Sequence, residues 1–269
     1  MQLGGVIVGN LDGQVAIVTG AARGIGAGIA LELAARGAHL ALMGRTVPAL
    51  EETAERIRRE TSAQVSLHPG DVSKEECVER VVGDVFKRFG KIDVLVNNAG
   101  IVDPAAFLDI ELAGWSSVIA TNLTGVFLMT QRAARCMRGG GGGAVVNICS
   151  IDAYGTDGPG ASYSAAKAGL LGLTKAAATE LAAINVRVNS VSPGWVRTQM
   201  VEEFVSPNAL KHMLGNFERV PMRRLVEIPE VARAVAFLAG PESSAITGID
   251  LPVDCGTLSN LFVYESLPQ

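Results

Sequence analysis

The chain has 269 residues, of which 48% are hydrophobic and 19% charged, and its formal net charge is -4. This length can bury a sizeable core, and the composition is typical of a packed globular protein rather than a disordered one. The acidic balance does not favour a nucleic-acid partner, and the absence of a run of 18 apolar residues argues against a membrane span.

Short apolar runs alternate with amphipathic segments along the chain, and this alternation predicts strands and helices in turn. Strict strand–helix alternation implies a parallel sheet with helices on both faces. We therefore predict an α/β fold, a single doubly wound Rossmann-type domain over residues 1–269 with a seven-stranded parallel sheet. The expected strands are 14–19, 39–42, 64–67, 92–96, 144–149, 186–191 and 249–253, and the expected helices are 24–36, 47–60, 74–89, 112–137, 162–183 and 229–239.

Two segments carry more local predictions. Ser73 and Glu76 have the spacing of a capping box, with Ser73 as the N-cap of the helix 74–89. Residues 198–217 show a weaker helical pattern, so we expect a less regular segment there.

The first predicted strand runs directly into Gly20, Gly24 and Gly26, and a helix follows. Glycines at this spacing allow a tight turn whose backbone N–H groups approach a pyrophosphate, with the positive end of the helix dipole facing that anion. They could equally be ordinary turn glycines, but the strand before and the helix after favour a dinucleotide site.

The end of the second strand indicates which dinucleotide is bound. A carboxylate there would hold the ribose diol of NAD, but this chain has Gly44 and Arg45, and Arg23 lies inside the glycine loop. Two guanidinium groups suit a 2′-phosphate, so NADP(H) is the predicted cofactor, although both arginines could be solvated surface residues. Asp71, after the third strand, could accept a hydrogen bond from the adenine amino group or cap a helix.

Tyr163 and Lys167 lie four residues apart in a predicted helix and therefore share one face. A free phenol ionises only near pH ~10, and an adjacent ammonium stabilises the phenolate. Such a pair is often just an exposed helical pair. Ser150 changes the balance, because it ends a strand at the ligand crevice, where its hydroxyl can donate to a carbonyl oxygen.

Asparagines mark two further positions. Asn122 falls in the middle of a predicted helix, where Asn is disfavoured, so we expect a structural or water-holding role. Asn98, Ala99 and Gly100 follow the fourth strand, where side-chain amides can satisfy turns beside the cofactor.

Together and in this order, the motifs resemble those of the short-chain dehydrogenase/reductase family, nearest to 3-oxoacyl-carrier-protein reductases. The resemblance covers residues 11–256 and implies hydride transfer between NADP(H) and a carbonyl or secondary alcohol, with no metal. It implies that Tyr163 is the general acid or base, that Lys167 assists it and binds the nicotinamide ribose, that Ser150 orients the carbonyl, and that Asn122 holds a water. The cofactor contacts that it implies or supports are Gly20, Arg23, Ile25, Asp71, Val72, Asn98, Pro193, Gly194, Val196 and Thr198.

The sequence departs from the family pattern at two positions. Arg135 matches a basic position that can meet an acidic carrier protein, but Thr179 stands where a second basic residue is expected, which weakens the carrier-protein interpretation. Cys255 stands where the family usually has glycine, which puts the local C-terminal geometry in doubt. The resemblance also implies a homotetramer or homodimer built on the helices around 112–137 and 162–183, although their small residues could pack within one subunit.

Substrate specificity is expected from segments that flank Tyr163, including a lid over residues 195–220. Asp152 could recognise a substrate hydroxyl or amine, or be a solvated loop residue. Trp195, Met200 and Phe204 could form an apolar wall, or pack in the core.

Three functions stay open. The first is an NADP-dependent carbonyl reductase, with a 3-oxoacyl thioester as one candidate substrate. The second is an NAD-dependent alcohol, polyol or steroid dehydrogenase, and the third is a non-catalytic dinucleotide sensor on the same fold. Four scattered cysteines without a paired spacing fit free thiols in a reducing cytoplasm, and three histidines do not suggest a zinc site.

Overall fold

Seven strands form one parallel sheet in the order β3-β2-β1-β4-β5-β6-β7. The computed structural model describes residues 10–156 and 158–260. The strand order reverses between β1 and β4, which is where a doubly wound sheet opens a ligand crevice at its carboxyl edge. The predicted fold class is confirmed. The strands are β1 (Val15–Thr19), β2 (His39–Gly44), β3 (Val65–Pro69), β4 (Val94–Asn97), β5 (Gly143–Ile148), β6 (Val186–Pro193) and β7 (Asp250–Val253).

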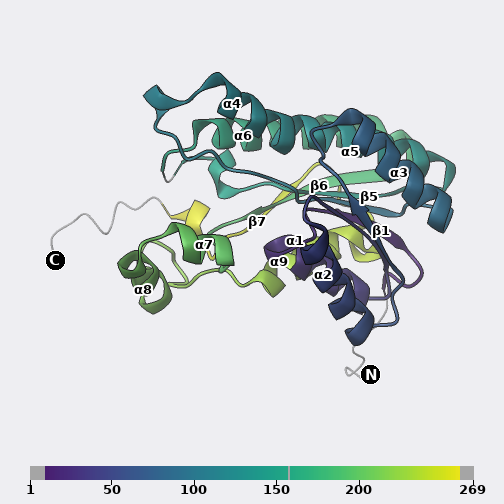
Figure 1. Cartoon of the computed structure of the whole chain (residues 1–269), viewed down its shortest axis with the longest axis horizontal. Coiled ribbons are helices and arrows are strands. Elements are labelled where there is room, and N and C mark those ends of the chain that lie inside the picture. The colour runs from purple at the N-terminus through teal and green to yellow at the C-terminus, as the bar shows by residue number, and fades with distance from the viewer. Residues whose placement is uncertain (1–9, 157, 261–269) are drawn as a thin grey trace.

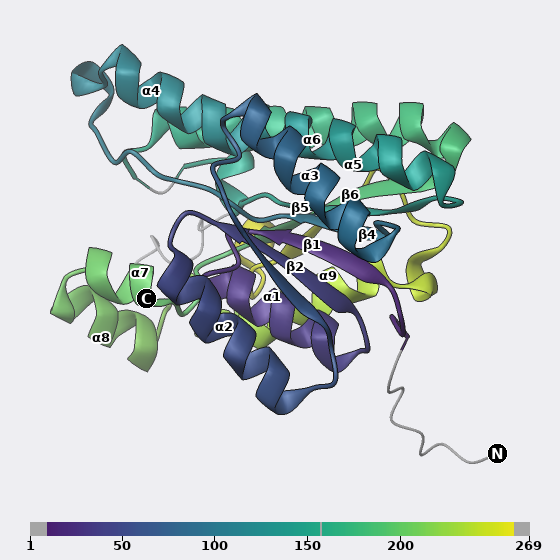
Figure 2. The same ribbon diagram turned by 45° about the vertical axis from the view of Figure 1, so that its right-hand side comes forward.

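Helices cover both faces of this sheet (Figures 1 and 2). Alternate strand residues point to opposite faces, so Ala16 and Val18 pack in one core cluster while Val15 and Ile17 pack in the other. The first face carries α1 (Gly24–Ala35), α2 (Val47–Glu60) and α9 (Ile228–Ala239), and the second carries α3 (Glu75–Phe89), α5 (Gly125–Gly139) and α6 (Ala161–Leu181).

The predicted helix 112–137 is interrupted in its middle. α4 (Leu112–Ile119) passes through a π-helical turn at Ala120–Thr124 into α5. By length and composition alone, the stretch Leu112–Gly139 could cross a bilayer. Met129, Ala133 and Met137 on it pack in the core against the sheet, which accounts for part of its apolar character.

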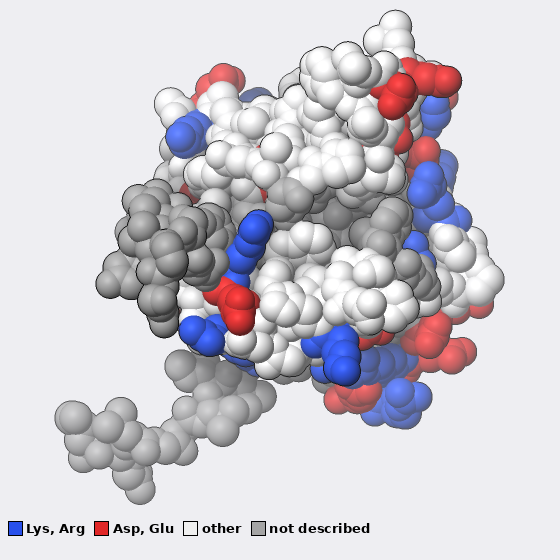
Figure 3. Space-filling view, turned by 90° about the vertical axis from the view of Figure 1, so that its left-hand side faces the viewer, with Lys and Arg blue, Asp and Glu red and all other residues white. Residues whose placement is uncertain are grey.

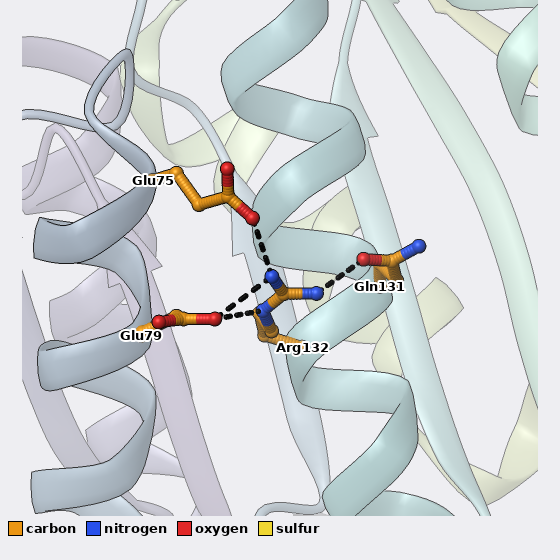
Figure 4. A network of polar contacts seen from close by, with 4 residues as sticks. All are labelled: Glu75, Glu79, Gln131 and Arg132. Carbon is orange, nitrogen blue, oxygen red and sulfur yellow. Dashed lines mark hydrogen bonds and ion pairs between the residues drawn. The ribbon is translucent and has the colours of Figure 1, made fainter.

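An ion-pair cluster joins α3 to α5 (Figure 4). The guanidinium of Arg132 on α5 donates to Glu75 at 2.6 Å and to Glu79 at 2.9 Å on α3, and it also contacts Gln131. The Arg132 side chain is only 14% exposed, whereas the two carboxylates are more than half exposed. Partial burial of the shared cation makes the cluster a firmer link than an isolated surface pair.

Two local predictions were wrong. The expected capping box does not form, because Lys74 occupies the N-cap of α3 and the Ser73 hydroxyl instead donates to Asp71 at 2.8 Å. The helix begins at Glu75, one residue later than expected, so Ser73 lies outside the N-cap position. The segment 198–217 is also more regular than expected. It contains α7 (Gln199–Phe204) and α8 (Pro207–Gly215). Their N-cap residues are Thr198 and Ser206, whose side chains accept hydrogen bonds from backbone N–H groups of the first turn.

Cys255 adopts the left-handed backbone conformation, with φ of 55°. This explains the usual glycine at that position, since a side chain there costs about 1 kcal/mol. The departure from the family pattern therefore leaves the path of the chain intact. It stores a small local strain beside the end of β7.

A half-buried cation closes the carboxyl end of α9. The guanidinium of Arg187 on β6 donates to the carbonyl oxygens of Leu238 at 2.8 Å and Gly240 at 3.1 Å, and to the Ser243 hydroxyl at 2.8 Å. Burial lowers the pKa of Arg187 from its usual value. The free carbonyls at a helix end and the helix dipole both favour a positive charge at this point.

We predict that Arg187→Met lowers the free energy of unfolding by about 2–4 kcal/mol, because several buried carbonyl groups lose a charged donor. Urea unfolding followed by circular dichroism measures this loss. Arg58→Met, on the exposed face of α2, is the matched control and should change stability by less than about 0.5 kcal/mol. Equal effects of the two substitutions would contradict the assignment.

Candidate active site

A cleft of about 660 Å³ opens at the carboxyl edge of the sheet. Its walls come from the segments that follow β1, β2, β3, β4, β5 and β6, together with the first turns of α6. This volume is typical of a small-molecule site. Every residue that the sequence predicted to contact the cofactor lines this cleft, including Gly44, Val72, Pro193 and Thr198.

The glycine loop after β1 is fastened to the segment after β4. The Asn98 amide donates to the carbonyl oxygens of Thr19 at 3.0 Å and Gly20 at 3.1 Å, and the Thr19 hydroxyl accepts from the backbone N–H of Asn98 and Ala99. A Cβ on Gly26 would lie 2.2 Å from the Gly20 carbonyl oxygen. Only glycine therefore lets α1 begin this close to the loop, with its N-terminus facing the cleft.

Two exposed arginines border the far end of the cleft. Arg23 is the N-cap of α1, and Arg45 follows β2. Neither guanidinium forms an ion pair with another described residue. Burial raises the pKa of Asp71, but hydrogen bonds from Ser73 and the charge of Arg45 outweigh it and hold that pKa below its usual value. The positive charge at this end is therefore available to an anion.

The sequence left two roles open for Asp71, an adenine contact and a helix cap, and the structure partly supports the second. Its Oδ1 accepts from the backbone N–H of Ser73 at 2.9 Å and from the Ser73 hydroxyl, so it organises the turn that leads into α3. The same residue also lines the cleft. The structure thus supports a turn-forming role and leaves the adenine contact as a proposal.

Ser150, Tyr163 and Lys167 meet on one side of the cleft. Ser150 directly follows β5, and Tyr163 and Lys167 lie one turn apart on α6. The Lys167 ammonium donates to the Ile148 carbonyl at 2.6 Å and lies 5.4 Å from the centre of the Tyr163 ring. The expected shared helix face is therefore present, and Lys167 is not the exposed surface residue of the alternative interpretation.

Burial changes the pKa of Lys167. Lys167 is only 4% exposed, and burial lowers the pKa of its ammonium below the usual range, while Cys149 and Asp152 oppose that shift. The hydroxyl of Ser150 accepts from the backbone N–H of Asp152 at 3.1 Å. That bond fixes the oxygen and leaves its proton for a group in the cleft.

Asn122 lies in the π-helical turn and is fully buried, but it does not line the cleft. Its amide oxygen accepts from the N–H of Ile101 at 2.9 Å, and its amide nitrogen donates to the carbonyl of Ile101 at 2.9 Å. The side chain thus anchors the segment after β4. This agrees with the structural role and leaves a water-holding role as a proposal.

The predicted substrate residues separate into two groups. Asp152 and Trp195 line the cleft. Met200 and Phe204 lie on α7, but their side chains are outside the described part of the structure. The sequence missed Ile101, Val102 and Gln199, which also line the cleft. These residues directly follow Gly100 and Thr198 in the sequence, and that adjacency could have identified them as lining residues.

The segment that contains α7 and α8 begins and ends at a short parallel bridge between Val196 and Val226. The N–H of Val226 donates to Trp195 at 2.8 Å, and the N–H of Arg197 donates back to Val226 at 2.8 Å. Arg224 and Glu230 lie on either side of Val226 in the sequence, and hydrogen bonding to Arg224 lowers the pKa of Glu230 to about 2. The segment between residues 197 and 226 therefore leaves and rejoins the domain at one fixed root, and it projects from the sheet as α7 and α8 (Figure 1). Gln199 and Val201 of α7 line the cleft.

Comparisons with known proteins agree with this geometry. Residues 20–257 match the family model described as enoyl-(acyl carrier protein) reductase. A cis-4-hydroxycyclohexanecarboxylate dehydrogenase of Sinomonas cyclohexanicum is 40% identical over 90% of this chain and 96% of its own length. A 3-oxoacyl-[acyl-carrier-protein] reductase of Chlamydia muridarum is 38% identical over 91% of this chain and 98% of its own length.

A solved structure is similar as well. The crystal structure of a short-chain type dehydrogenase/reductase from Mycobacterium marinum superimposes with a TM-score of 0.85. It is 37% identical in sequence, and the match covers 93% of this chain and 97% of the other.

We predict that Gly26→Ala lowers the free energy of unfolding by about 1–3 kcal/mol, because the added methyl group would collide with the Gly20 carbonyl and the Asn98 amide. Gly139→Ala is the matched control, since nothing lies within 4 Å of a Cβ at that position. Urea unfolding of both variants checks the prediction, and a Gly26→Ala variant as stable as the wild type would refute it.

Proposed function

The chain belongs to the short-chain dehydrogenase/reductase family of oxidoreductases, and on that premise we propose that it transfers a hydride between NADP(H) and a carbonyl or secondary alcohol. The observation that carries this proposal is the meeting of two constellations in one cleft. The glycine loop before α1 lies at one end, and Ser150, Tyr163 and Lys167 lie at the other. The whole chain acts as one domain in this proposal.

The cofactor end of the cleft fits a dinucleotide phosphate. Backbone N–H groups at the start of α1 face the space where a pyrophosphate would lie, and the close approach at Gly26 keeps that space open. Arg23 and Arg45 would bind the 2′-phosphate, and Asp71 and Val72 would border the adenine. Gly24, Ile25, Asn98, Ala99, Gly100, Gly194, Val196 and Thr198 would line the rest of the cofactor.

The catalytic end fits proton transfer to or from a substrate oxygen. A bound nicotinamide would supply or accept the hydride. Tyr163 would donate the proton in reduction and accept it in oxidation, with the Lys167 charge stabilising its phenolate. Ser150 would donate its hydroxyl proton to the same oxygen and orient the carbonyl. Asn122 would hold the segment that borders this end, together with a water.

A 3-oxoacyl thioester is the substrate class that we favour, since a curated relative is named as a 3-oxoacyl reductase. Trp195, Met200 and Phe204 would form an apolar wall from the lid, and Asp152 would contact a polar group of the substrate. The exposed Arg135 would meet an acidic carrier only weakly, because Thr179 lacks a charge.

We propose a homotetramer or homodimer as the functional form. The helical stretch Leu112–Gly139 is strongly apolar, yet only 33% of its most apolar 18-residue window is buried within one subunit. An apolar face of this size is covered most simply by a second copy of the same helix.

The face drawn in Figure 3 mixes blue and red side chains around a mainly white centre, which does not favour a nucleic-acid partner. Free thiols at all four cysteines fit a cytoplasmic location.

Two alternatives keep a specific test. An NAD-dependent alcohol, polyol or steroid dehydrogenase would bind NADH at least as well as NADPH. A non-catalytic dinucleotide sensor would bind the cofactor without turnover, but it would have no need for the complete set of Ser150, Tyr163 and Lys167.

We predict that Arg45→Ala weakens NADPH binding by about 10- to 100-fold and leaves NADH binding within about twofold, because only NADPH carries the 2′-phosphate that the guanidinium would pair with. Fluorescence titration of both cofactors measures the two affinities. Arg58→Ala on α2 is the control and should leave both unchanged. A parallel loss for the two cofactors would contradict the assignment.

We predict that Tyr163→Phe lowers kcat for ketone reduction by at least about 100-fold and leaves NADPH affinity unchanged, because only the proton donor is removed. Tyr154→Phe is the matched control. The Tyr154 hydroxyl donates to Asp250 at 2.8 Å and does not line the cleft, so that variant should keep most of its turnover. Full turnover by Tyr163→Phe would remove the proposed mechanism.

A further inference from the structure

The first turns of α6 carry Tyr163 and Lys167 but receive little local stabilisation. The N-cap residue is Gly160, so no side chain caps the helix, and its first turn contains no acidic residue. Ser162 is buried, but its hydroxyl has no hydrogen-bond partner among the described residues. Side-chain caps and acidic residues are the usual local support of a helix start. The position of this end of α6 therefore depends on contacts with the rest of the domain.

Three consecutive residues at the end of β5 contact α6. The amide of Asn147 donates to the Thr174 hydroxyl at 3.0 Å. The carbonyl of Ile148 accepts from the Lys167 ammonium at 2.6 Å, and the thiol of Cys149 donates to the Lys167 carbonyl at 3.3 Å. Lys167 is therefore held twice, once by its side chain and once by its backbone. These two contacts at Lys167 form a clip between β5 and α6.

Cys149 provides a fixed point for this clip. Its backbone N–H donates to the carbonyl of Val191 on β6 at 2.8 Å, so its main chain is fixed to the sheet. Its side chain is buried and packs with Val126 and Leu170. Burial raises the pKa of the thiol, while the charge of Lys167 opposes that shift. The thiol therefore keeps its proton at neutral pH and can donate it.

We propose that Cys149 is a positioning residue for the reaction: its hydrogen bond to the Lys167 carbonyl sets the position of α6 relative to Ser150. Ser150 directly follows Cys149 in the sequence, and Tyr163 lies one turn before Lys167. The clip therefore joins the two segments whose side chains must reach one substrate oxygen. A misplacement of about 1 Å in such a site can cost ~100-fold in rate. This inference rests on the proposed function, since it takes Ser150 and Tyr163 to act on that oxygen.

Cys149→Ala removes the donor without leaving the Lys167 carbonyl unsatisfied, because a helical carbonyl also accepts from the N–H four residues further on. We expect kcat for NADPH oxidation with acetoacetyl-CoA to fall about 5- to 20-fold, while KM and NADPH affinity stay within about twofold. Cys149→Ser keeps a hydroxyl donor, so its kcat should return to within about threefold of the wild type. Packing alone predicts the opposite order of the two variants, because a hydroxyl is less favourable than a methyl group beside Val126 and Leu170.

Backbone hydrogen exchange reports on this end of α6 without any turnover. Exchange of the amides of residues 163–171, followed by mass spectrometry, should be at least about fivefold faster in Cys149→Ala and within about twofold of the wild type in Cys149→Ser. Urea unfolding of the same variants separates this local effect from a global loss of stability. Cys136→Ala on α5 is the matched control, because that thiol is partly buried and does not line the cleft. It should leave both kcat and the exchange rates unchanged.

Two results would overturn the inference: wild-type exchange rates in Cys149→Ala, or a Cys149→Ser variant no better than Cys149→Ala. Turnover by the wild type with an unchanged kcat in Cys149→Ala would also overturn it, and would leave the proposed function standing. No turnover by the wild type would refute the proposed reduction of a 3-oxoacyl thioester. Faster exchange in Cys149→Ala, restored in Cys149→Ser, would in that case still support the positioning of α6 by Cys149.

Discussion

The close contact between the glycine loop and Asn98 is the constraint on which the rest of the site depends. Asn98 binds the carbonyl groups of Thr19 and Gly20, and Gly26 lets α1 begin against the same carbonyl. These bonds hold the carboxyl ends of β1 and β4 together at the point where the strand order reverses. This contact aligns the cleft with the N-terminus of α1, which is the geometry on which the proposed phosphate site depends.

A second, buried set of polar contacts joins β4 to α6, the helix that holds Tyr163 and Lys167. Asn97 donates to Asn147 on β5 at 2.9 Å and to Thr130 on α5 at 3.0 Å, and Asn147 donates to Thr174 on α6 at 3.0 Å. Buried amides are costly unless satisfied, so these bonds specify how α5 and α6 sit on the sheet. The position of α6 in turn sets where Tyr163 and Lys167 face Ser150.

Sequence patterns were sufficient to predict the sheet and to place the glycine loop, Ser150, Tyr163 and Lys167 at its carboxyl edge, because each depends on local periodicity or on a strand end. They were insufficient where a polar side chain had several partners to choose from. Ser73 donates to Asp71 instead of capping α3. The helices α7 and α8 were also missed, because they are short and begin at the caps Thr198 and Ser206 rather than following a long apolar stripe. The Arg187 contacts could not be foreseen, since they join residues more than 50 positions apart.

The most direct test of the central claim is the fate of the hydride itself. NADPH with deuterium at both C4 positions of the nicotinamide is incubated with the protein and a 3-oxoacyl thioester, and the product is analysed by mass spectrometry and NMR. Our account predicts one deuterium on the former carbonyl carbon of the 3-hydroxyacyl product. A reduced product with only protium at that carbon, or no reduction although NADPH binds, would contradict it.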